Sequence, residues 1–177
     1  MASELIVQTL KGPTSGANAN KILLGSGQEL YAPGHVIQVV QGSTNTNTYI
    51  IGTTTYTDTT LTASITPKST NSKILVTINQ CFYADRDSDG LAVKLRILRD
   101  STTVYENDAL FATVESGSIA QVKFGGLTTV SYLDSPSTTS AVTYKTQGAP
   151  TTTLNNAFVR FQSADEYSFI TLMEIAG

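Results

Sequence analysis

The segment KILVTINQCFYA, residues 73–84, alternates apolar and polar side chains with a period of two. Ile74, Val76 and Ile78 share one face of an extended chain, and the other face carries threonine, asparagine and cysteine. The segment LAVKLRILRD, residues 91–100, repeats this alternation with lysine and arginine on its polar face. A period of two is typical of a half-buried β-strand. No segment carries a sustained apolar stripe with a helical period, so we expect helix to be scarce.

Short β-branched runs separated by turn-rich clusters continue from residue 35 to the C-terminus. They include HVIQVV, NTYIIGTTTYTD, LTASITPKST, SIAQVKF, LTTVSYLD, AVTYKTQ, AFVRFQ and YSFITLMEIAG. Roughly eight to ten short strands in one body are typical of a two-sheet sandwich. We therefore expect an all-β fold, an antiparallel β-sandwich or jelly roll, over residues 35–177.

The C-terminal strand differs from the others because it is apolar on both faces. Phe169, Met173 and Ile175 lie on one face, and Ile170 and Leu172 lie on the other. A strand of this kind belongs in the middle of a sheet or between packed layers.

Residues 1–34 lack this texture and carry glycine or proline every few positions, as in LKGPTSGANANKILLGSGQELYAPG. Their apolar pieces are too short to form a core element. We interpret this segment as an extended arm that gains order by packing on something else, with a disordered tail as the alternative.

The polarity of the chain comes from hydroxyl and amide side chains. Charged residues make up 14% of the sequence, against roughly 25% in an ordinary soluble domain. The net charge of -3 and the pI near 5.0 provide no basic surface for a nucleic-acid backbone, so we expect no nucleic-acid partner. No run approaches the ~18 apolar residues of a membrane span, and the N-terminus does not resemble a signal peptide. With one cysteine, Cys81, the chain cannot form its own disulfide, and we expect it to be made in a reducing cytoplasm.

Three aspartates stand at alternate positions of YADRDSDGLA and are followed by a glycine: Asp85, Asp87, Asp89 and Gly90. This spacing matches the start of an EF-hand loop. The twelfth position, where an EF-hand needs a bidentate glutamate, is Arg96, and both flanks alternate like strands, so we reject the EF-hand. We favour a solvated hairpin tip, and a weaker calcium site, partly neutralised by Arg86, remains the alternative.

Candidate catalytic groups are few. His35 has no nucleophile beside it in the sequence. Cys81 is interpreted as a small buried apolar residue. The carboxylates are scattered: Glu29, Glu106, Asp108, Glu115, Asp134, Asp165, Glu166 and Glu174. Glu174 lies in the apolar last strand, which suggests a buried charge paired with a residue such as Arg160 or a place at a subunit seam. The glycine patterns do not form a phosphate loop. We predict no catalytic, cofactor or metal site and no enzymatic activity.

Four segments together resemble virion appendage proteins of tailed bacteriophages, especially marine and cyanobacterial ones. They are ELIVQTLKGPTSGANANKILLGSGQ, SITPKSTNSKILV, YLDSPSTTSAVTYKTQ and FITLMEIAG. Members of this family resemble, in their C-terminal body, the trimeric jelly rolls of the C1q and tumour-necrosis-factor class, whose apolar final strand runs through the trimer centre. The resemblance implies a virion structural protein and supplies no catalytic residues.

The resemblance and the residues lead to one main hypothesis. The chain is expected to be a homotrimeric fibre or appendage, assembled in the host cytoplasm, whose arm docks on other virion proteins and whose body contacts host-surface polysaccharide. The candidate contact loops are Asp85–Gly90 and Ser135–Ser140. The alternatives are a capsid decoration protein and, from another class, a soluble sugar-binding module or depolymerase, which would need two facing carboxylates.

Overall fold

The computed structural model describes residues 13–17, 32–88, 90–108 and 121–177. The chain divides after Ala32 into two units, and the second unit, Pro33–Gly177, holds the strands that the structure describes. Most of the predicted docking arm, residues 1–34, lies outside the described residues, so the arm stays a prediction. No helix in the described part is long and apolar enough to cross a membrane.

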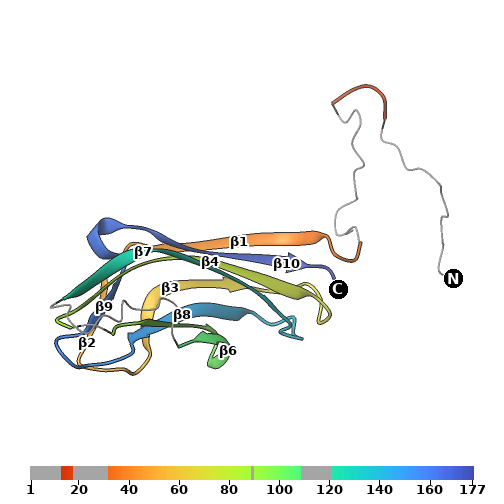
Figure 1. The fold of residues 1–177 in the computed structure, drawn as a ribbon. Coiled ribbons are helices and arrows are strands. Elements are labelled where there is room, and N and C mark those ends of the chain that lie inside the picture. Colours follow the sequence, from red (N-terminus) through yellow and green to blue (C-terminus); the bar gives the residue numbers. More distant parts are fainter. Residues whose placement is uncertain (1–12, 18–31, 89, 109–120) are drawn as a thin grey trace. The chain divides into compact units, whose positions relative to one another are not determined.

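The second unit is a sandwich of two antiparallel sheets (Figure 1). Sheet A contains β1 (Val36–Thr44), β2 (Thr48–Ile51), β4 (Lys73–Arg86), β7 (Val122–Asp134), β9 (Phe158–Phe161) and β10 (Ser168–Ile175). Sheet B contains β3 (Thr57–Ile65), β5 (Val93–Arg99), β6 (Thr102–Asn107) and β8 (Val142–Pro150). The described helical structure is limited to one 3-10 turn, η1 (Ser163–Asp165), as the missing helical period predicts.

The long strand β4 organises sheet A. One edge of β4 pairs with β7 along its length, and the other edge pairs first with β10 and then with β9. β1 pairs with the outer edge of β10, and β2 pairs with the outer edge of β9. β10 and β9 therefore lie next to β4, and β1 and β2 lie one strand further out. Sheet B has the order β3-β8-β5-β6. Because the chain passes from one sheet to the other at most connections, the topology is that of a jelly roll, which confirms the predicted fold class.

The period of two places the core between the sheets. Ile74, Val76 and Ile78 of β4 and Leu95 and Ile97 of β5 are all 0% exposed, on the faces that the alternation assigns to them. Burying one such side chain contributes about 1.5–3 kcal/mol relative to leaving it in water. The predicted place of the last strand is also confirmed, since β10 lies between β1 and β4.

A hydrogen-bonded polar cluster lies inside this apolar core. The carboxamide of Gln80, 0% exposed, accepts a hydrogen bond from Thr146 Oγ1 at 2.8 Å and donates one to Ser168 Oγ at 3.1 Å. Thr59 Oγ1 lies 2.5 Å from Thr146 Oγ1. The cluster therefore ties β4 and the start of β10 in sheet A to β3 and β8 in sheet B.

Candidate functional site

The outer face of sheet A carries a line of apolar side chains that runs across four neighbouring strands. Val39, Met173, Leu75 and Leu133 stand opposite one another in register, from β1 through β10 and β4 to β7. Val39 is 57% exposed and Leu133 49% exposed. Side chains in such register lie within contact distance of their neighbours, so the row forms a continuous apolar stripe.

The two rows beside this stripe are uncharged as well. They contain Gln41, Thr171, Thr77 and Ser131, then Ser43, Phe169, Asn79 and Thr129. We call these three rows the uncharged face. Among the outward-facing residues of the six strands of sheet A, the charged ones lie toward the two ends: Lys73 at one end, and Arg160, Asp85 and Lys123 at the other.

An aromatic cluster borders the uncharged face at the Arg160 end. The Arg160 guanidinium lies 4.7 Å from the ring centroid of Tyr49 and 5.2 Å from that of Phe158. The Tyr49 and Phe158 rings meet edge to face at 5.0 Å, and Tyr49 is 48% exposed. Exposed tyrosine and stacked arginine are the residue types that anchor protein interfaces.

The position of Cys81 corrects an expectation. Cys81 is half-buried rather than buried, because it lies on the outward side of β4 between the uncharged face and the aromatic cluster. Its thiol donates to the Tyr167 carbonyl at 3.1 Å. Partial burial, together with the charge of Glu166, raises the pKa of the Cys81 thiol above its ordinary value, so the thiol is protonated at neutral pH and is a weak nucleophile.

The outer face of sheet B is charged and cross-linked. Asp58 pairs with Lys145 at 2.9 Å and accepts a hydrogen bond from Gln147 Nε2. Arg96 Nε donates to Gln147 Oε1 at 2.8 Å, and the Arg96 guanidinium stacks 4.2 Å from the centroid of the Tyr56 ring. Each polar group is therefore fixed by its neighbour across three strands.

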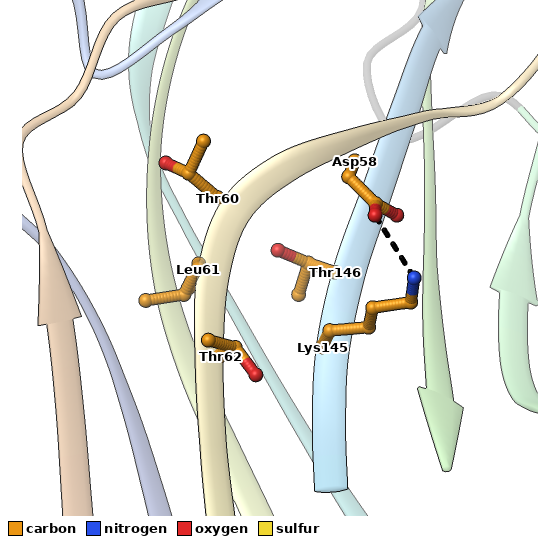
Figure 2. A pocket seen from close by; sticks show the side chains of 6 residues that line it. All are labelled: Asp58, Thr60, Leu61, Thr62, Lys145 and Thr146. Carbon is orange, nitrogen blue, oxygen red and sulfur yellow. Dashed lines mark hydrogen bonds and ion pairs between the residues drawn. The ribbon is translucent and has the colours of Figure 1, made fainter. Parts of the chain in front are cut away.

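A pocket of about 150 Å³ opens beside this network, at an irregularity between β3 and β8 (Figure 2). In the register, Asp58 stands opposite Gln147 and Thr62 stands opposite Lys145, so β3 advances four residues while β8 advances two. Thr60, within the bulge, has a φ of 68°, a conformation that β-branched residues rarely adopt. The pocket is lined by Asp58, Thr60, Leu61, Thr62, Lys145 and Thr146.

The two loops predicted to contact the host do not lie together. β7 starts opposite Arg86 and ends opposite Ile74, so Ser135–Ser140 lies at one end of β4 and Asp85–Gly90 at the other. Fourteen residues of β4, at about 3.3 Å each, separate the two loops by roughly 40 Å. β1 enters the sandwich at the Ser135–Ser140 end, because Val36 pairs with Ile175 and Ile175 with Lys73.

The Asp85–Gly90 loop joins β4 of sheet A to β5 of sheet B, so the predicted hairpin tip is wrong. Its described aspartates are held by amides and by one cation, since Lys123 Nζ lies 3.7 Å from Asp85 Oδ2. Gln121 Nε2 donates to Asp85 at 3.2 Å and to Asp87 at 3.0 Å, and Asn156 Nδ2 donates to Asp87 at 2.8 Å. In the described part of the chain, no three metal-ligating side chains gather to hold an ion. Asp89 lies outside that part, so the calcium alternative stays untested.

Glu174 is buried, as predicted, but the suggested partner Arg160 is wrong. Its carboxylate accepts hydrogen bonds from Gln38 Nε2 at 2.6 Å and from the backbone N–H of Lys68 at 2.7 Å. Burial opposes ionisation, but these hydrogen bonds outweigh it and hold the pKa of Glu174 below its ordinary value. Arg160 instead stacks on the outward side of sheet A.

The remaining candidates have structural partners where they are described. Asp134 binds Arg99 at 2.7 Å and accepts a hydrogen bond from Tyr144 at 2.7 Å. Glu106 pairs with Arg96 at 3.5 Å. His35 contributes its carbonyl to Ala176 N at 2.9 Å. Asp108 accepts from Tyr56, and Asp165 and Glu166 are exposed around η1. Glu29 and Glu115 lie outside the described residues.

Comparisons with known proteins add little to this picture. No family model matches the sequence and no curated protein matches it, so the resemblance to phage appendage proteins stays a prediction. A solved structure of dimeric latent PorU from Porphyromonas gingivalis is similar over 86% of this chain and 14% of its own, with 9% identity and a TM-score of 0.38.

Two structures from infectious bursal disease virus are similar over 93% of this chain. One is of the Gt strain, with 12% identity and a TM-score of 0.36, and the other is of a VP2 subviral particle, with 11% identity and a TM-score of 0.35. The chain spans less than half the length of each of these proteins, at 46%. Likenesses this distant carry no functional argument, and the function has to be argued from the molecule itself.

Proposed function

We propose that this chain is a non-enzymatic structural protein of a phage particle, a homotrimeric fibre or appendage that assembles through the uncharged face of sheet A. The observation that supports this proposal is the uncharged face itself. Its stripe of Val39, Met173, Leu75 and Leu133 crosses the whole sheet, and the last strand contributes to all three of its rows.

The chemistry of this face fits a second copy of the same chain. Contiguous apolar surface rimmed by polar groups is typical of a protein interface. The centre of such an interface is depleted in charge, because desolvating an unpaired ion is costly. The two rows on one side of the stripe carry hydroxyls and amides, which can form hydrogen bonds across the contact. Three copies, rather than two, follow from the resemblance to trimeric jelly rolls.

The virion location rests on the four resembling segments. The arm would dock on other virion proteins. β1, the first strand of the sandwich, starts at the Ser135–Ser140 end, so the Asp85–Gly90 end would point away from the particle. In that orientation only Asp85–Gly90 of the two predicted loops would be distal, so we propose this loop for the host contact. A capsid decoration protein would use the same assembly at another site on the particle.

The mass of the purified chain in solution tests the assembly. Light scattering should give three times the 18.8 kDa chain mass, both for the full chain and for a version that lacks residues 1–32. Monomers in both would overturn the assembly and leave a soluble sugar-binding module as the leading alternative. Release of reducing sugar from host polysaccharide would overturn the non-enzymatic assignment.

Immunogold labelling of intact particles tests the location. An antibody against the sandwich should mark the tail or its fibres. Labelling over the head would favour the decoration protein, and unlabelled particles would overturn the virion assignment.

A further inference from the structure

The pocket between β3 and β8 is built by a defect in sheet B. Between Asp58 and Thr62 the ladder to β8 is interrupted, because β3 carries extra residues there. Thr60 is held at its φ of 68° by a hydrogen-bond contact of 3.0 Å between its hydroxyl and that of Thr44. Strained residues of this kind cluster at ligand sites. Bulges likewise occur next to functional sites, where they redirect side chains.

The pocket combines an acceptor and a donor that are held in place by their neighbours. Figure 2 shows the side chains of Asp58, from β3, and Lys145, from β8, pointing toward one another. Their side chains are 53% and 32% exposed, so both can reach a ligand. Leu61 and Thr146, 1% and 0% exposed, line the pocket from the core side.

The carboxylate is oriented before any ligand arrives. Gln147 presents its amide N–H to Asp58 because its carbonyl oxygen is occupied by Arg96, and Arg96 is itself held on Tyr56. Burial opposes ionisation of Asp58, but the hydrogen bonds from Lys145 and Gln147 hold its pKa below the ordinary value. Asp58 is therefore an ionised acceptor at neutral pH, with lone pairs left on both oxygens.

From this arrangement we infer that the pocket binds a neutral hexose unit of a polysaccharide. A carboxylate can accept hydrogen bonds from two adjacent sugar hydroxyls, and the lysine ammonium can donate to a sugar oxygen. The charges of Asp58 and Lys145 balance, so neither an acidic nor an amino sugar is favoured. The pocket volume of about 150 Å³ equals that of about five waters at ~30 Å³ each, which suits one sugar ring.

The inference rests on the proposed function only in naming host polysaccharide as the source of the sugar. If sheet A is covered by neighbouring copies, the outer face of sheet B is the one that stays open. Three such pockets per trimer would compensate for a weak single site through avidity. Sugar binding by the pocket itself does not depend on the trimer.

Titration of the isotope-labelled full chain followed by NMR tests the inference. The probes are the methyl glycosides of glucose, galactose and mannose, and sodium glucuronate, each up to about 100 mM because single-site sugar affinities near 1 mM correspond to only about 4 kcal/mol. We expect saturable shifts of the backbone amides of Thr60–Thr62 and Lys145–Gln147 with at least one neutral glycoside. Absence of saturation with all three neutral glycosides would overturn the inference, and saturation by glucuronate alone would overturn the neutral class.

Two matched variants locate the site. Asp58→Asn removes the pocket carboxylate, and we expect it to weaken binding about tenfold or more, as for loss of a charged hydrogen bond. Glu106→Gln removes the carboxylate of another ion pair on the same face and should leave affinity within about twofold. Equal affinity of Asp58→Asn and the unmodified chain would overturn the site.

The mass of each sample separates this inference from the proposed function. A trimer that binds none of the neutral glycosides overturns the inference alone. A monomer that binds one of them through Asp58 overturns the trimer alone.

Discussion

The two outer faces of the sandwich offer opposite surfaces. On sheet A the outward positions of β1, β10, β4 and β7 form three rows without a charge. On sheet B the outward positions carry Asp58, Lys145, Arg96 and Glu106, joined in cross-strand pairs. Both faces use threonine and serine freely, so hydroxyl content does not distinguish them.

The difference teaches which face is adapted to water. Exposed ion pairs contribute little stability, about 0–1 kcal/mol each, but they keep a β-surface soluble and discourage the association of strands. Sheet B has this protection and the central rows of sheet A lack it. The proposed trimer would cover these uncharged rows of sheet A and leave the charged face of sheet B in water.

The largest expected effect comes from placing a charge in the apolar row of the uncharged face. Val39→Asp should dissociate the trimer, because the new carboxylate would be buried without a partner at a cost of about 3–5 kcal/mol. Val39 is 57% exposed in the single chain, so the monomer should still fold. Sedimentation at micromolar concentration measures the loss.

The matched control is Ser64→Asp, an exposed position on the outer side of β3 in sheet B. It should leave the trimer mass unchanged. Reaction of Cys81 with a maleimide gives an independent readout, since its thiol borders the uncharged face and should react faster in the dissociated variant. Dissociation by both variants, or by neither, would break the proposed contrast between the faces.

The second effect concerns the interior link between the two sheets. Gln80→Ala removes one hydrogen bond from Thr146 and one from Ser168, each of which keeps another partner, and two hydrogen bonds at about 0.5–1.5 kcal/mol each amount to about 1–3 kcal/mol. The free energy of unfolding measured in urea should fall by that amount, while the folded variant should retain its oligomeric state. Thr77→Ala, an outward position on the same strand, is the control and should change stability much less.

Local alternation was enough to predict much of this architecture. The inward positions of β4 and the place of β10 between two strands follow from a period of two and from apolarity on both faces. The same alternation places Cys81 on the other face of the strand from Ile74, Val76 and Ile78, so the pattern predicts its partly exposed position. The apolar neighbours of Cys81 along the chain suggest burial, but the face on which it lies determines its exposure.

The pocket and the loop positions could not be predicted, because both depend on pairing between distant segments. Asp58 and Lys145 are 87 residues apart, and the threonine-rich run around Thr60 does not mark a bulge. The separation of Asp85–Gly90 from Ser135–Ser140 follows only from the register of β4 with β7. Glu174 was predicted to be buried from its strand, but its partners Gln38 and Lys68 come from two other segments.

The third effect is a pH dependence centred on Glu174, which faces inward behind the uncharged face. The pKa of Glu174 is lower in the folded chain than its ordinary value of 4.5. Its contribution to folding stability is therefore present above pH 4.5 and is lost as the pH falls through the folded-state pKa. Thermal unfolding of the monomeric Val39→Asp variant should show a lower midpoint at acid pH. Adding Glu174→Gln should make the unfolding midpoint less sensitive to acid pH, because the titrating carboxylate is gone. A pH profile unchanged by Glu174→Gln would contradict the lowered pKa of Glu174.

The smallest effect is expected on sheet B. Lys145→Gln breaks the ion pair with Asp58, whose side chain is 53% exposed, so the free energy of unfolding should fall by about 1 kcal/mol or less. The difference from the unmodified chain should shrink further in about 1 M salt, where the screening length is about 3 Å. Denaturation in urea, which is uncharged, at low and high salt measures both numbers. A loss well above this, insensitive to salt, would mean that the charged face of sheet B is buried, and the assignment of sheet A as the covered face would have to be reversed.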